Sequence, residues 1–223
     1  MLALLYPILL AFTTVDTLDN ITRIKVYNQV GNVKVVYSNV PFLKITEYSA
    51  DTTKSVFNVK KSIKREMLTL EIKPKMSCSE CGADITIGID SLKYLDIEVT
   101  SGNVETRTGI NQLSLSVMSG NVQLEGNFDR LTAEVLSGNL KINTQKLDTL
   151  DISVSSGSVI AKLQNIVYSG KINVLVGSIN LHIPQNQALS AILLQKQDTI
   201  KKEGKGNLVV KVTSGNLKIA NNK

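Results

Sequence analysis

The stretch Leu95–Val104, LDIEVTSGNV, decides the fold because its pattern recurs along the chain. Its central tripeptide, Ser-Gly-Asn, returns with glycines 18, 18, 19, 20 and 38 residues apart, and two copies carry Ser in place of Asn. A fixed period of this size is typical of stacked repeat architectures. The residues that mark the copies are Gly102, Asn103, Gly120, Asn121, Gly138, Asn139, Gly157, Gly177, Gly215 and Asn216.

The side chains around each glycine alternate between apolar and polar. Around Gly138 the apolar residues are Leu131, Ala133, Val135 and Leu140. Such alternation predicts strands with one buried face. The buried positions lie at odd offsets before the glycine and at even offsets after it, so one extra residue must be absorbed there. The chain therefore turns a corner, where Gly supplies a positive φ and Asn tolerates a left-handed conformation.

A connecting arc between copies carries one apolar residue each time, which predicts a third, inward-facing wall. These residues are Ile110, Phe128, Leu147 and Ile166. We predict an all-β fold, a β-solenoid (β-helix) of 18–20-residue rungs, and no copy has room for a helix. An antiparallel sandwich is the alternative, since it also uses regular short strands. Its hairpins, however, would not place the same residue at the same offset in every copy.

Residues 17–223 form one predicted β-solenoid domain, with cap strands over 17–90 and repeat rungs over 91–223. The cap is irregular and partly antiparallel, with Gly31 at a first partial rung and a hairpin around Lys64-Arg65-Glu66. A second, exposed hairpin is expected at residues 201–206, where Lys and Gly residues gather.

Residues 1–16 open with an uncharged apolar run, MLALLYPILLAFTT. Fourteen residues of helix span about 21 Å, which is short of the hydrocarbon layer. We predict a signal peptide, or failing that a short uncleaved N-terminal anchor or a buried first strand. A signal peptide would place the protein outside the cell or in its envelope.

The net charge of +6 is concentrated in two segments. The body of the chain is near neutral, and the basic residues of these segments are Lys60, Lys61, Lys64, Arg65, Lys201, Lys202 and Lys205. They are either solvated loops and edge strands or contacts for a surface glycan, an envelope polymer or a protein partner. Nucleic acid is not an expected partner, and membrane contact is expected only through an uncleaved N-terminus.

Cys78 and Cys81 are the two cysteines of the chain. A local disulfide is the expectation in an exported loop, and free thiols, a metal site or a redox site are the alternatives. The single His and the absence of Trp make an enzyme a weak prospect. We expect no catalytic residues, no metal and no cofactor. Glu98 and Glu134 share an offset two rungs apart and are interpreted as a solvated strand face.

The segments Asp84–Ile87, Leu95–Val104 and Leu208–Leu217 resemble the DUF4097 group of adhesin-like proteins, which is related to the DUF2807 head GIN domain. The resemblance covers residues 21–220 and implies a β-helical fold, an envelope or extracellular location and no established activity. Many members carry Asp where this chain has Asn at the corners.

Three functions follow from these observations. The first is an exported, non-catalytic, adhesin-like binding or structural protein of the cell surface or envelope. The second is a filament or envelope-layer subunit that assembles through the edges of the solenoid. The third is a carbohydrate-active β-helix enzyme, which needs reactive groups that the sequence does not gather.

Overall fold

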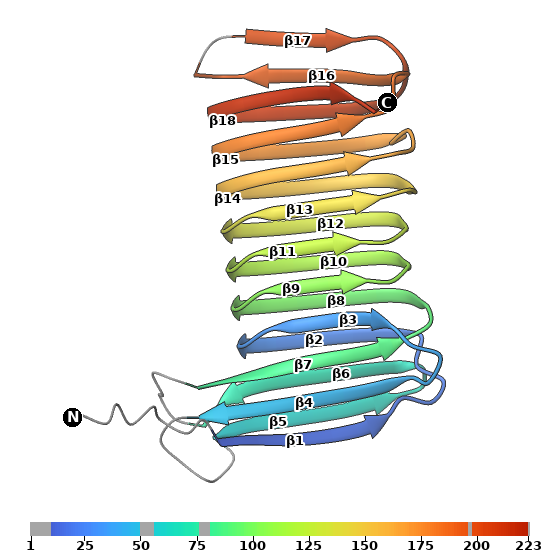
Figure 1. Ribbon diagram of the computed structural model, residues 1–223, viewed down its shortest axis with the longest axis vertical. Helices are drawn as coiled ribbons and strands as arrows, with labels where there is room; N and C mark the ends of the chain where they lie inside the picture. Colours follow the sequence, from blue (N-terminus) through green and yellow to red (C-terminus); the bar gives the residue numbers. More distant parts are fainter. Residues whose placement is uncertain (1–9, 50–55, 76–80, 196–197, 223) are drawn as a thin grey trace, which may run out of the picture.

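The computed structural model describes residues 10–49, 56–75, 81–195 and 198–222, and eighteen β-strands make up its regular structure (Figure 1). The strands form an elongated stack, with the antiparallel strands gathered at its two ends. Within the described residues there is no helix of the length and apolar character needed to span a bilayer. The predicted all-β solenoid is confirmed.

The repeat appears as two strands per rung that meet at the Ser-Gly-Asn corner, on the left of Figure 1. Equivalent strands of successive rungs pair in parallel and in register, so that Val99, Val117 and Val135 form one column. The rung strands are β8 (Leu92–Ser101), β9 (Val104–Arg107), β10 (Ile110–Ser119), β11 (Val122–Glu125), β12 (Phe128–Ser137), β13 (Leu140–Thr144), β14 (Leu147–Leu163) and β15 (Ser169–Ile183). In β14 and β15 the strand continues through the corner.

Burial follows the predicted alternation on both sides of the corner. Val135 and Leu140 are fully buried, while Gly138 between them is half-buried and Asn139 is exposed. The change of parity at the glycine is therefore present in the structure, and the inward columns form one continuous hydrophobic core.

The predicted inward-facing residues of the arc are confirmed for three rungs. Ile110, Phe128 and Leu147 are buried, and each is the first residue of the next long strand. In the following rung Val167 is buried and Ile166 only partly so. The arc there is one residue longer than in the rung before, which moves the inward position from Ile166 to Val167.

The corners are held together by close backbone contact. Gly138 has a φ of +140°, and a Cβ added to it would lie 1.8 Å from the carbonyl oxygen of Gly120. Its N–H donates to the Ser156 carbonyl of the next rung at 2.9 Å. Similar clashes would arise at the other corner glycines, which are Gly31, Gly102, Gly120, Gly157, Gly177 and Gly215. Glycine is thus required by both conformation and space.

A ladder of side-chain amides runs along the same corner. The Oδ1 atom of Asn121 accepts the backbone N–H of Asn139 at 3.1 Å and its side-chain N–H at 3.0 Å. Asn103 and Asn32 continue the ladder downward, and it ends on the carboxylate of Asp84, which accepts two bonds from Asn32. The predicted corner asparagines at 103, 121 and 139 therefore link rung to rung.

The N-terminal end does not stack in sequence order. The first rung pair, β2 (Arg23–Val30) and β3 (Val33–Tyr37), lies between β8–β9 on one side and β6 (Met67–Pro74) with β7 (Cys81–Ile89) on the other. Three antiparallel strands close this end, namely β1 (Leu10–Thr17), β4 (Phe42–Ser49) and β5 (Phe57–Lys64). The partly antiparallel cap exists, but the parallel stack reaches further into it than predicted.

The C-terminal end is also assembled out of order. The last strand, β18 (Lys205–Asn221), stacks directly on β15 and pairs through its first half with β16 (Gln187–Leu193). β16 pairs in turn with β17 (Asp198–Lys202) as an antiparallel hairpin. Residues 201–206 comprise the end of β17, a two-residue link and the start of β18, and they do not form the predicted hairpin.

Residues 10–16, predicted as part of a signal peptide or anchor, lie in β1. This strand pairs with β4 at the edge of the sheet, and its side chains from Ala11 to Val15 are exposed. The strand is therefore not a buried one. Cleavage or anchoring of residues 1–16 stays a prediction.

Replacing a corner glycine should destabilise the whole stack. We expect Gly138→Ala to lower the free energy of unfolding by about 2–4 kcal/mol, because the alanine would have a disfavoured φ and its Cβ would clash with the Gly120 backbone. Gly109→Ala is the matched control, because the nearest atom to an added Cβ there is the Asn127 carbonyl oxygen at 3.9 Å. Urea denaturation gives the free energy of unfolding of both variants, and equal values would contradict the conclusion that the corner requires glycine.

Candidate binding surface

The first predicted basic segment lies at the N-terminal end of the stack. Lys60, Lys61 and Lys64 are exposed on β5, and Arg65 follows in the turn with a φ of +55°. Lys61 contacts Asp16 at 2.8 Å and Lys60 contacts Glu71 at 3.7 Å. Exposed pairs of this kind contribute little stability, so the segment is a solvated edge strand that carries positive charge.

The second basic segment lies at the opposite end, on β17 and at the start of β18. Lys201 and Lys205 are exposed. Lys202 donates to the Asn221 Oδ1 atom at 2.7 Å and to the Pro184 carbonyl at 3.4 Å, so it ties the hairpin to the rung below. The structure thus keeps the two basic segments apart, at the two ends of the solenoid, and they do not form one site.

The other predicted positions gather no reactive group. Cys81 begins β7, but Cys78 lies outside the described residues, so the Cys78–Cys81 disulfide stays a prediction. Glu98 and Glu134 are exposed, and both pair in register with Ser116, which separates them. Within the described residues, no three His, Cys, Asp or Glu side chains are grouped so as to hold a metal ion.

Sequence reasoning missed a surface at the edge of the stack where the arcs connect one rung to the next, which is the right-hand edge in Figure 1. Three hollows of about 540, 700 and 220 Å³ each have Gln164 among their lining residues. We call this surface the Gln164 groove. Its polar and aromatic lining comprises Glu125, Asn127, Asn143, Gln145, Lys146, Asp148, Lys162, Gln164, Asn165, Tyr168, His182, Gln185, Asn186, Asn221 and Asn222.

The groove forms where the arcs lengthen. The spacing of the corner glycines grows from 18 to 19 and then to 20 residues over the rungs that begin at Gly120, Gly138 and Gly157. The added residues fall in the connections, because the strands on either side stay in register. Residues of the two longer arcs, among them Lys146 and Gln164, line the first hollow.

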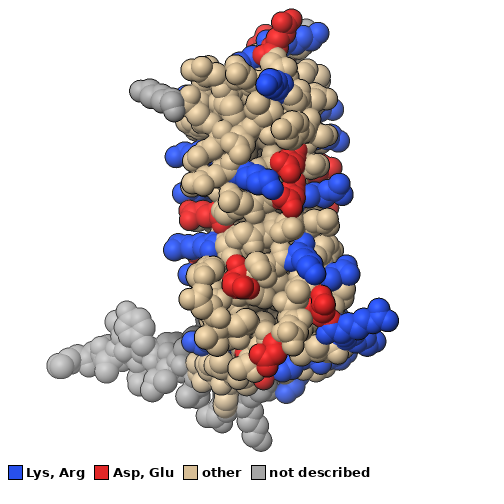
Figure 2. All heavy atoms as spheres, turned by 90° about the vertical axis from the view of Figure 1, so that its right-hand side faces the viewer, with Lys and Arg blue, Asp and Glu red and all other residues tan. Residues whose placement is uncertain are grey.

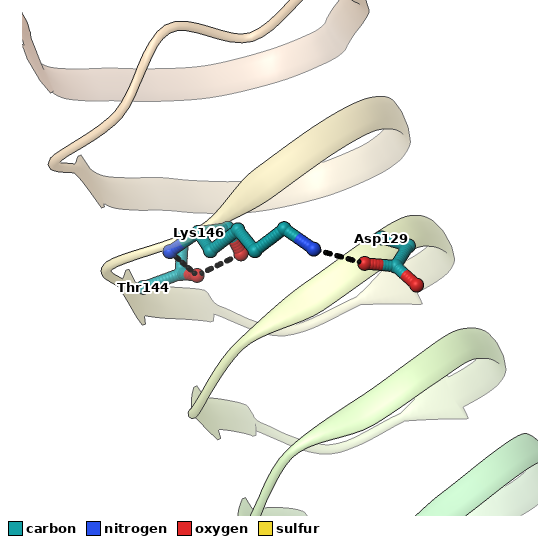
Figure 3. Close-up of polar contacts among 3 residues, drawn as sticks. All are labelled: Asp129, Thr144 and Lys146. Atoms are coloured by element: carbon teal, nitrogen blue, oxygen red, sulfur yellow. Dashed lines mark hydrogen bonds and ion pairs between the residues drawn. The ribbon is translucent and has the colours of Figure 1, made fainter.

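Lys146 is fixed in the groove by two rungs (Figure 3). Its ammonium group donates to the Asp129 carboxylate at 2.6 Å, and its backbone N–H donates to the Thr144 hydroxyl at 3.2 Å. That hydroxyl donates in turn to the Lys146 carbonyl at 2.8 Å. The hydrogen bond to Asp129, with further attraction from Asp148, raises the pKa of Lys146 above its usual value. Lys146 is therefore charged and already paired.

Tyr168 is the aromatic residue of the groove, and its backbone is held on both sides. Its N–H donates to the Asp148 carbonyl at 3.0 Å, and its carbonyl accepts the N–H of Asn207 at 3.1 Å. The side chain is 69% exposed. A large ring that stays open to solvent on a fixed backbone is suited to stacking against a flat apolar surface.

Gln187, the first residue of β16, holds the arc from the buried side. It is fully buried, its Oε1 atom accepts the Val167 N–H at 2.7 Å, and its Nε2 atom donates to the Val167 carbonyl at 3.1 Å and the Ala188 carbonyl at 3.0 Å. This one side chain therefore satisfies both backbone groups of the residue that precedes Tyr168. Buried polar groups of the backbone need such partners.

Removing the Gln187 amide should loosen the arc. We expect Gln187→Leu to lower the free energy of unfolding by about 2–4 kcal/mol, because two buried backbone groups of Val167 lose their partner. Gln185→Leu, at an exposed position of the same turn, should change it by less than about 0.5 kcal/mol. Urea unfolding compares the two, and an equal effect would rule out the bracing role of Gln187.

Charge on the edge that carries the groove is mixed. Figure 2, which views the right-hand side of Figure 1, shows basic and acidic side chains interspersed along the height of the stack. The edge thus carries both signs of charge, and the C-terminal basic segment meets the groove at Lys202, which bonds the lining residues Asn221 and Pro184.

The comparisons with solved structures return proteins of similar length but low identity. A "putative cell adhesion protein" from Clostridium sporogenes is 10% identical at a TM-score of 0.44, with 95% of this chain and 99% of that chain covered. A "putative lipid binding protein" from Parabacteroides distasonis is 13% identical at a TM-score of 0.43, with 96% and 97% covered. A "putative adhesin" from Parabacteroides merdae is 14% identical at a TM-score of 0.39, with 95% and 93% covered. Values this low support no statement about function.

No curated protein matches the chain. The family comparison is decisive, since the model of the Toastrack DUF4097 family matches residues 16–220. The match spans the capped stack from the end of β1 to β18. The resemblance that the corner motifs carry is therefore confirmed, and the chain belongs to the Toastrack DUF4097 family.

Proposed function

We propose that this protein is an exported, non-catalytic, adhesin-like binding protein of the cell surface or envelope. The observation that carries the proposal is the Gln164 groove, which lies on a scaffold whose corners are in close backbone contact and, from Asn32 to Ser158, are joined by hydrogen bonds of asparagine side chains. Its lining is rich in amide groups, which donate and accept hydrogen bonds but are poor acids, bases and nucleophiles. Such a surface is suited to recognition.

Export is supported by the uncharged apolar run at the start of the chain. We expect the full chain, carrying a C-terminal epitope in a bacterial expression host, to be exported and to yield a mature mass that lacks the N-terminal segment. A chain without residues 1–16 should stay in the cytoplasm. Fractionation, intact-mass measurement and protease treatment of whole cells give the result, and cytoplasmic retention of the full chain would contradict the proposal.

Assembly through an edge is a second candidate function, favoured by the second half of β18. β16 covers only the first half of this strand, and among the described residues no strand pairs with the outer edge of Leu217–Asn221. Leu217 and Ile219 on this half are only partly buried. An open strand edge beside partly exposed apolar side chains is a surface on which another strand can add.

The edge proposal is tested by measuring the molar mass of the protein in solution. If molecules associate through the edge of β18, light scattering during size-exclusion chromatography should show a molar mass that rises with protein concentration, and Ile219→Lys should abolish the rise. Ile160→Lys is the control, because Ile160 is 40% exposed on a strand in the interior of the stack. A monomer at every concentration would rule out assembly and leave the binding proposal intact.

A further inference from the structure

The Gln164 groove crosses several rungs in register. Glu125, Asn143, Lys162, His182 and Ala220 occupy equivalent positions on neighbouring strands, each paired with the next. With neighbouring strands about 4.8 Å apart, this row spans about 19 Å along the stack. A row of side chains at this interval matches an extended polymer whose repeating unit is of similar length, as a pyranose unit is.

The charges of the groove cancel. Three lysines, Lys146, Lys162 and Lys202, lie in it or at its end, against the acidic Glu125, Asp129 and Asp148. Lys146 and Lys202 are moreover already bonded to groups of the protein. An anionic polymer would find no excess of positive charge here, whereas it would at the basic segments of the two ends.

The remaining lining suits an uncharged, hydroxyl-rich ligand. Gln164, Asn165, Gln185 and Asn186 are exposed amides beside Tyr168. Amide groups both donate and accept, which matches the hydroxyl groups of a sugar. The faces of a sugar ring carry C–H groups, and these pack against an aromatic ring in the way that Tyr168 allows.

We propose that the Gln164 groove binds an uncharged glycan chain that lies along the stack axis, with a sugar ring stacked on Tyr168 and its hydroxyl groups bonded by the flanking amides. This inference rests on the proposed binding function and adds the class of ligand. Hydrogen bonds from Gln187, Asp148 and Asn207 hold the backbone that carries the ring before the ligand arrives, which reduces the entropy of the arc that is lost on binding.

The test uses the purified full-length protein and a panel of hexasaccharides. The uncharged probes are cello-, chito-, laminari- and mannohexaose, and the anionic probe is hexagalacturonate. We expect at least one uncharged probe to bind by isothermal titration calorimetry, with amide chemical shifts of the 164–168 arc changing in NMR spectra. Tyr168→Ala should weaken this binding at least about tenfold, and Gln164→Ala several-fold.

Tyr37→Ala is the matched control, since Tyr37 is 62% exposed at the end of β3, in the N-terminal part of the stack. It should bind like the unaltered protein, and circular dichroism melting should confirm that all three variants fold. Binding of no uncharged probe, binding of hexagalacturonate alone, or binding that Tyr168→Ala leaves unchanged would overturn the inference. The export experiment is independent of these outcomes, so the inference can fail while the proposed surface location stands.

Discussion

The contact between one corner glycine and the carbonyl group of the corner below is the constraint on which the structure depends. At Gly138 the space of a Cβ is filled by the backbone of Gly120, and at Gly157 by that of Gly138. Each corner is thereby locked onto its neighbour in a single register. A shift of one residue would turn every inward valine outward, so the corner contact also selects which side chains form the core.

The groove depends on the same constraint. Because the corners fix the strands in register, extra residues can be accommodated only in the connections at the far edge of each rung. The rungs that begin at Gly138 and Gly157 carry one and two residues more than the rung that begins at Gly120. The scaffold is therefore regular on its corner side and variable on its arc side, where the hollows lie.

The sequence predicted the solenoid, its corners and its inward columns, because these features recur at fixed offsets. It misplaced Ile166, since the lengthened arc shifts the buried offset to Val167. It also did not reveal that β2–β3 lies between two later rungs, because an offset shows which face a residue buries but not which rung is its neighbour.

The groove was missed for a related reason. Its residues differ from rung to rung, so Gln164 and Tyr168 carry no periodic signal. The length of the arc was nevertheless visible in the glycine spacing, and the growth from 18 to 20 residues could have indicated where the surface opens. The basic segments stood out in the sequence, but only the topology shows that they belong to opposite ends.

The order of stacking has a consequence for how the chain folds as it leaves the ribosome. β2 pairs first with β6, 44 residues later in the chain, and β3 with β7, 52 residues later. Their partners on the other side, β8 and β9, follow only after 71 residues, which is the separation of the bonded Asn32 and Asn103. β18, which follows β15 and β16 in the sequence, pairs with both of them and lies between them. Non-local pairing of this kind slows folding, and it leaves a nascent chain open to binding by chaperones until its final strand emerges.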